Sequence, residues 1–257
     1  MIRAGVPPIS RGVDGVQRIL LCGAIALVAF LYSSVGHAGA SGYIAVLTLC
    51  GFAAADIKPT ALVLNILVAS IGSFQFWRAG HFFWNFFWPF AVLSIPAAFL
   101  GGYVHLPTPL FKTLLGVVLL LSAARLYWKP GDVTDSKAPA RPVAVGVGAS
   151  IGFLSGLTGT GGGIFLTPLI LFLHWAKTKQ AAATSAVFIL VNSSLGLIGH
   201  VSSGKPVPSF AWKLAVAAVV GGTLGSYLGS ARLPARAIQM LLGVVLVIAG
   251  TKLIFTR

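Results

Sequence analysis

The chain has 257 residues, of which 57% are hydrophobic and only 9% are charged. Apolar runs of about 20 residues span a bilayer, and many runs here approach that length, which predicts an all-α, polytopic protein of the lipid bilayer without a soluble domain. The 18 Lys and Arg against four acids give a net charge of +14, but the basic residues flank apolar segments, which favours lipid headgroups and excludes a nucleic-acid partner.

Five apolar pieces follow a basic N-terminal segment of residues 1–18. They cover approximately residues 19–35, 42–52, 59–76, 82–104 and 110–128, which we predict to form a first membrane repeat of residues 19–128. The second piece is too short for an ordinary span. Because Gly36, His37 and Gly39 precede it, we expect a helix broken by glycine at this point.

A second membrane repeat is predicted over residues 143–257, after a proline-containing linker of residues 129–142. Its apolar pieces cover approximately residues 143–157, 164–175, 181–201, 210–229 and 235–255. A glycine-rich segment again separates the first two pieces and consists of Thr158, Gly159, Thr160, Gly161, Gly162 and Gly163. The ten pieces form about eight transmembrane spans if each broken pair counts as one.

The two halves share matched positions at a nearly constant offset. Gly36 and Gly39 match Gly159 and Gly162 at an offset of 123, and Asn65 matches Asn192 at an offset of 127. The six residues 114–119 recur without change at 241–246. We interpret these matches as an internal duplication.

Paired glycine breaks inside apolar segments indicate a substrate route. Lipid tolerates irregular backbone only where protein or a water-filled cavity shelters it, and broken helices surround the substrate in transporters built from repeats. Free N–H groups at helix N-termini favour an anion, with Ile164 expected to begin the helix after the second break. The alternative is that these glycines only permit close helix crossing.

Side chains near the breaks extend the candidate site. Asn65 and Asn192 lie inside corresponding apolar pieces, where each contacts the cargo or forms an interhelical hydrogen bond. His37 is a donor to an anion, a proton carrier or a structural donor. Thr158 and Thr160 add hydroxyl groups.

The orientation of the halves depends on the broken pairs. If each pair forms one interrupted span, the halves run parallel, and a cytoplasmic N-terminus places 12 basic residues inside and six outside. If each pair forms a hairpin, the halves are inverted and nine basic residues lie on each side. The positive-inside rule favours the parallel arrangement, whereas facing half-helix ends favour the inverted one.

The second glycine segment resembles a known family. Residues 153–163, the following Thr167-Pro168-Leu169, the looser first copy and the later run from Gly221 to Gly225 are similar to the TauE/SafE family of sulfite exporters. This resemblance covers residues 19–255 and implies a permease of the inner (plasma) membrane that moves sulfite or related organosulfur anions. A passive anion channel is the alternative function.

Catalysis is not expected. Glutamate is absent, and the four aspartates lie at or beyond the edges of apolar runs. This pattern argues against metalloprotease and aspartyl-protease sites and against a carboxylate proton relay. We therefore predict a non-enzymatic transporter of a small anionic substrate, with no cofactor and no metal.

Overall fold

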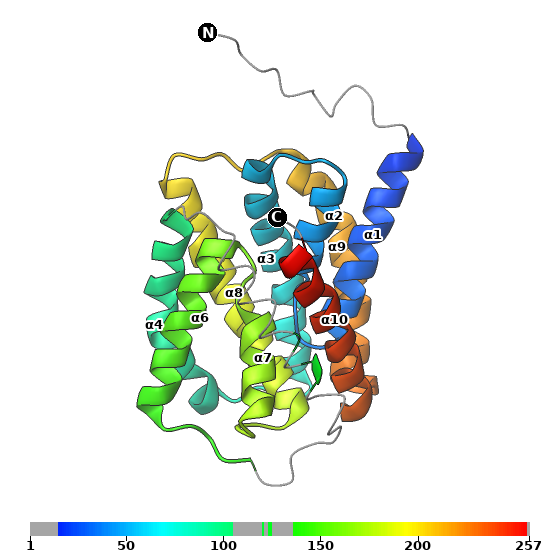
Figure 1. Ribbon diagram of the computed structural model, residues 1–257. Coiled ribbons are helices and arrows are strands. Elements are labelled where there is room, and N and C mark those ends of the chain that lie inside the picture. The colour runs from blue at the N-terminus through cyan, green and yellow to red at the C-terminus, as the bar shows by residue number, and fades with distance from the viewer. Residues whose placement is uncertain (1–14, 105–119, 121–122, 125–135, 256–257) are drawn as a thin grey trace.

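The computed structural model describes residues 15–104, 120, 123–124 and 136–255. Throughout these ranges the regular elements are helical and no β-strand occurs. In chain order they are α1 (Gly15–Ser34), α2 (Ala40–Leu49), α3 (Ala54–Arg78), α4 (Trp84–Tyr103), α6 (Arg141–Thr158), α7 (Gly163–Phe172), α8 (Thr178–Ser202), α9 (Phe210–Tyr227), a π-helical turn η1 (Leu228–Arg232) and α10 (Ala235–Phe255) (Figure 1). The predicted piece at 110–128 and the first part of the predicted linker lie mostly outside the described residues.

Nine of the ten predicted apolar pieces thus correspond to helices with bounds that shift by a few residues. The largest difference is at α3, which begins at Ala54 although the predicted piece begins at residue 59. Asp56 lies in the first turn of α3, where a carboxylate favours the positive end of the helix dipole. The first turn of α3 is therefore helical although it contains a charged residue, and hydropathy alone does not predict that the helix begins there.

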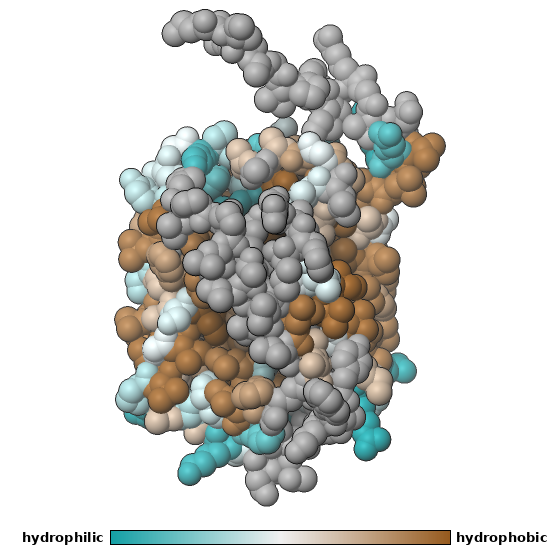
Figure 2. All heavy atoms as spheres, in the orientation of Figure 1, coloured by the Kyte–Doolittle hydropathy of each residue, from teal (hydrophilic) through white to brown (hydrophobic). Residues whose placement is uncertain are grey.

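The surface fits a bilayer. Five described helices, α1, α3, α4, α8 and α9, are long and apolar enough to cross a membrane. On the face that Figure 2 shows, apolar residues predominate across the middle of the molecule and hydrophilic residues gather toward both ends. Large apolar side chains such as Trp77, Leu100, Trp212 and Val216 are exposed, as expected for groups that face lipid.

Two helix pairs pack through glycine contacts in parallel register. Three glycines of α6 meet three α4 residues in the same order: Gly148 against Phe90, Gly152 against Ser94 and Gly156 against Ala98. Glycines of α9 and η1 meet α1 in the same way: Gly221 against Ala26, Gly225 against Phe30 and Gly229 against Ser34. A Cβ atom at any of these six glycines would lie within 2.5 Å of a backbone oxygen. Glycine is therefore required for this close approach.

The central pair, α3 and α8, is antiparallel. Asn65 contacts Ser193, and Gly72, further along α3, lies against Ala186, which comes earlier in α8. The short connections from α3 to α4 and from α8 to α9 reverse the chain (Figure 1). Since α6 runs parallel to α4 and α1 runs parallel to α9, the helices α1, α3 and α4 run opposite to their counterparts α6, α8 and α9.

Each broken pair is a hairpin. Gly42 of α2 lies against Val28 and Tyr32 of α1, and Ser41 donates a hydrogen bond of 2.9 Å to the Tyr32 hydroxyl. At the second break, Gly162 lies against Ile151 and Ser155 of α6. The interrupted-span arrangement, which the count of basic residues favours, is therefore not the one adopted. Helix α2 returns along α1, and α7 returns along α8, with Gly163 against Ile189 and Thr167 bonded to Ser185.

Candidate functional site

Both glycine segments interrupt the helix through left-handed backbone. Gly36 (φ 78°) and Gly39 (φ 102°) lie between α1 and α2. The second break contains Gly159 (φ 76°), Gly161 (φ 76°) and Gly162 (φ 81°). Only glycine adopts these angles routinely, which is why the sequence places glycine at these five positions.

The short helices after the breaks have uncapped N-termini. Gly39 precedes α2 and Gly162 precedes α7, and neither start receives a side-chain cap. The first N–H groups of a helix have no partner within the helix, and they carry the positive end of its dipole. Helix α7 begins at Gly163, one residue before the predicted start at Ile164.

The second break faces the middle of the central helix pair. A Cβ atom at Gly161 would lie 2.8 Å from the Asn65 side-chain nitrogen and 2.7 Å from the Ser193 hydroxyl. At Gly163 it would lie 2.3 Å from Ile189. The backbone between α6 and α7 therefore lies directly against polar groups of both α3 and α8.

The first break faces the start of α8 and the side of α7. Gly36 is in contact with the backbone of Ala182. His37 Nε2 lies 2.8 Å from the Thr167 hydroxyl, which donates a hydrogen bond of 2.6 Å to Ser185. Because Thr167 uses its proton on Ser185, His37 Nε2 is the donor and Nδ1 of the neutral ring is an acceptor. Nδ1 is buried and has no partner among the described residues, so it donates to an anion only when the ring is protonated.

The two matched asparagines are fully buried but differ in their hydrogen bonds. Asn65 Nδ2 donates to the Ser193 hydroxyl at 3.3 Å, and Asn192 Nδ2 donates to the Phe188 carbonyl at 2.8 Å. Within the described ranges, neither Oδ1 atom has a partner. Rotation of the Asn65 amide leaves Ser193 as a donor to Oδ1 and frees the NH₂ group for an anion. Rotation of Asn192 would turn Oδ1 toward a carbonyl oxygen, so this amide stays an acceptor toward the solute.

Thr158 and Thr160 are hydrogen-bonded to each other through their hydroxyl groups. The Thr158 hydroxyl donates to the Leu154 carbonyl at 2.8 Å and lies 2.8 Å from the Thr160 hydroxyl. Its single proton is used, so Thr160 donates to Thr158. Neither hydroxyl proton is free for a solute in this arrangement, which differs from the expected role of these residues as anion donors.

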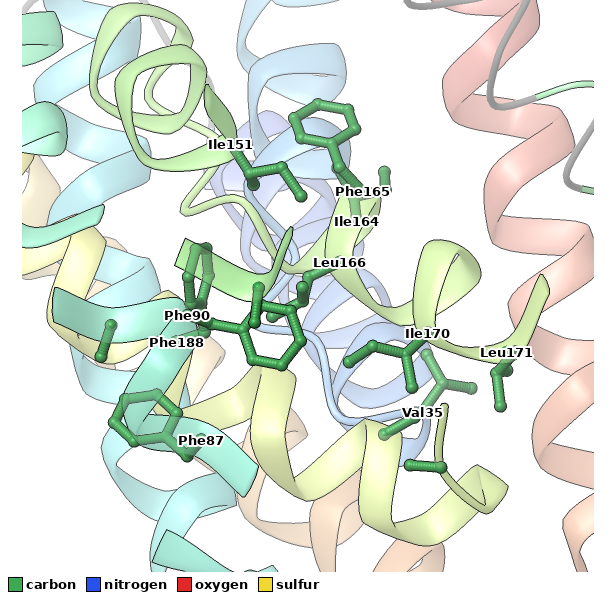
Figure 3. Packing of buried hydrophobic residues seen from close by; sticks show 14 of the residues in the cluster. Val35, Phe87, Phe90, Ile151, Ile164, Phe165, Leu166, Ile170, Leu171 and Phe188 are labelled. Carbon is green, nitrogen blue, oxygen red and sulfur yellow. The ribbon is translucent and has the colours of Figure 1, made fainter. Parts of the chain in front are cut away.

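An apolar cluster holds the second break in place. Figure 3 shows Ile164, Phe165 and Leu166 at the start of α7, with Ile151 of α6 and Phe188 of α8 nearby. A Cβ atom at Gly162 would lie 2.8 Å from the Phe188 ring. The side chains of Ile164, Phe165 and Leu166 therefore pack into an apolar cluster, while the backbone at Gly161 meets polar groups.

The predicted site did not include several other polar residues of this region. Thr184, Ser185 and Ser193 are fully buried on α8, and the hydroxyl of Thr184 has no partner in the described part of the chain. The available signal was their spacing, since Ser185 and Ser193 lie two turns apart on one helix face. Among the described residues, no group of three metal-binding side chains is found.

Comparison with known proteins identifies the family. The sequence model described as "Sulfite exporter TauE/SafE" matches residues 21–253. The chain belongs to the TauE/SafE family. This result confirms the resemblance found in the glycine segments, and it makes the protein a transmembrane transporter of that family.

Relatives within the TauE/SafE family cover almost the whole chain. A protein of Sinorhizobium fredii named "Probable membrane transporter protein y4hK" is 44% identical over 246 residues, which are 93% of this chain and 99% of that protein. The Bacillus subtilis "Probable membrane transporter protein YjnA" is 27% identical over 250 residues, 88% of this chain and 96% of its own. No solved structure is significantly similar to the chain.

Proposed function

We propose that the protein is a secondary transporter that moves a small anion, sulfite or an organosulfonate, across the plasma membrane by alternating access between two inverted repeats. The observation that carries this proposal is the pair of uncapped helix N-termini at the glycine breaks, placed against the central helices α3 and α8. The names of the relatives support transport in general. The chemistry of the breaks supports an anion, and the choice of sulfite or a sulfonate rests on the family description.

The opposite directions of corresponding helices support two inverted repeats. Every described helix of the first half has a counterpart of similar length, and each counterpart runs the other way. The contacts between halves are also reciprocal, because α4 packs on α6 and α9 packs on α1. Transporters with this symmetry switch between two exchanged states. Counting each hairpin as one membrane segment, the ten apolar pieces form eight segments.

The magnitudes favour an anion held by several weak donors. Desolvating an anion without partners costs several kcal/mol or more. A partly buried helix N-terminus contributes up to about 2 kcal/mol, and one hydrogen bond to a charged group contributes about 1.5–3 kcal/mol. Two helix ends and a rotated Asn65 amide together therefore offset the cost without binding the solute too tightly for release.

Flux measurements in proteoliposomes test the proposal. Vesicles loaded with sulfite or methanesulfonate should show saturable flux and counterflow. Gly162→Val should abolish most of the flux because the new side chain meets Phe188 and Ser155. Gly146→Val in α6 is the matched control, since nothing lies within 4 Å of the added Cβ atom.

The other outcomes are equally informative. Flux that never saturates and shows no counterflow would identify a passive anion channel. An absence of flux for sulfite, methanesulfonate and other small oxyanions would remove anion transport altogether.

A further inference from the structure

Lys58 lies where the second break meets the start of α3. A Cβ atom at Gly159 would lie 2.9 Å from the Lys58 side chain, and the ammonium group donates to the Gly102 carbonyl at 3.3 Å. Asp56 is the one acid within the described ranges. It precedes Lys58 by two positions on the same helix, a spacing at which side chains do not face each other. The positive charge therefore stands without a carboxylate beside a candidate anion path.

His200 adds a free polar group at the same end. Its side chain is 3% exposed, and neither ring nitrogen has a hydrogen-bond partner among the residues that the structure describes. Gly199, next to His200, lies against Phe99 and Tyr103 at the end of α4, where the Lys58 ammonium also binds the Gly102 carbonyl. Buried polar groups without partners are rare in folded proteins, so the two free nitrogens of this ring, at the same helix end as the Lys58 ammonium, favour an anionic partner.

A second Lys–His pair occupies the opposite end of the central helices. Lys179 lies near the start of α8, and its ammonium donates to the Ser230 carbonyl at 3.2 Å. His81, just after α3, contacts the same carbonyl at 3.2 Å through Nε2. Gly36 of the first break contacts Ala182, which lies one turn after Lys179.

The two pairs are related by the antiparallel order of α3 and α8. In each pair the lysine comes from the first turns of one central helix, and the histidine comes from the end of the other or just beyond it. Each lysine also binds a carbonyl at the end of a neighbouring helix. Lys58 lies beside Gly159 of the second break, and Lys179 lies one turn before Ala182, which Gly36 of the first break contacts. Each end of the central helix pair therefore carries one lysine and one histidine near a glycine break.

We propose that Lys58 and His200 form an anion access site at one end of the central helix pair, and that Lys179 and His81 form its counterpart at the other end. This inference rests on the proposed function, since these sites would deliver the transported oxyanion to the breaks from either side. The positive charge of the lysine at each site raises the local concentration of an anion and its rate of association.

Residue-specific acetylation of the purified wild-type protein tests the sites without transport. Methanesulfonate, added against gluconate at constant ionic strength, should slow the acetylation of Lys58 and Lys179 at least threefold by mass spectrometry. Lys213 is the internal control, because it is exposed and lies on α9 at the same end as Lys58, where Phe52 and Phe210 stack 4.7 Å apart. Equal rates with and without methanesulfonate would overturn the proposal.

Exchange kinetics in oriented proteoliposomes provide the second measurement. With saturating solute on the opposite side, Lys58→Gln should raise the half-saturation concentration at least fivefold on its own side and less than twofold on the other. Lys179→Gln should show the reverse, and Lys58→Arg should restore the affinity. Equal changes of the half-saturation concentration on both sides would overturn the inference. If methanesulfonate slows the acetylation of Lys58 but the protein shows no flux, the anion access site is supported and the proposed transport function is wrong.

Discussion

At the scale of single residues, the two matched asparagines are not equivalent. Asn65 faces a hydroxyl that accepts or donates, whereas Asn192 faces a carbonyl that only accepts. Once the Asn65 amide is rotated, the same residue type at matched sequence positions presents a free donor in one half and a free acceptor in the other. We expect the affinity for an anion to depend on Asn65.

Alanine substitutions separate these roles. Asn65→Ala should raise the half-saturation concentration for sulfite about 10-fold to 100-fold, since a hydrogen bond to a charged group contributes about 1.5–3 kcal/mol. Asn192→Ala should change this concentration less than threefold. Both are measured by flux in proteoliposomes, and an equal loss of affinity in the two variants would contradict the assigned difference.

His81 makes the protein sensitive to acid. Partial burial lowers the pKa of this imidazole, the Ser230 carbonyl opposes the shift, and the nearby Lys179 lowers it further. The unfolded chain therefore binds a proton more readily than the folded one as the pH falls through the ordinary value near 6.5. Folding stability should decrease from pH 7.5 to pH 5.5.

A single substitution isolates this effect. His81→Gln keeps a donor for the Ser230 carbonyl but does not titrate. The difference in Tm between pH 7.5 and pH 5.5, measured in detergent, should be smaller in this variant than in the wild type. An unchanged difference would show that other groups cause the acid sensitivity.

At the scale of helices, glycine stripes set the distance between α4 and α6. Gly152→Val would place a side chain within 2.5 Å of the Ser94 carbonyl oxygen. Overpacking of this kind costs about 1–3 kcal/mol, so the variant should unfold at a lower temperature. Gly146→Val, on the open side of the same helix, should leave Tm nearly unchanged, and equal losses would contradict the packing account.

At the scale of the whole molecule, the order of helices predicts the membrane side of each loop. Arg78 at the end of α3 and Lys177 before α8 should lie on one side, and Lys213 near the start of α9 on the other. Parallel halves would instead place Arg78 with Lys213. Single-cysteine variants at these three exposed positions, in a background without Cys22 and Cys50, distinguish the two by labelling with an impermeant maleimide in intact and permeabilised cells.

The linear sequence determined the apolar pieces, the positions of both breaks and the family, because hydropathy and glycine spacing are local properties. The relative directions of corresponding helices in the two halves were decided only by the tertiary structure. Basic residues are balanced across an inverted arrangement, so their count pointed to parallel halves, whereas the glycine contacts of α4 with α6 and of α1 with α9 fix the opposite result. Likewise, the hydrogen-bond partners of Asn65 and His37 come from the other half of the chain, and Gly159 of that half lies against Lys58. Long-range packing alone brings such groups together, and no local pattern encodes it.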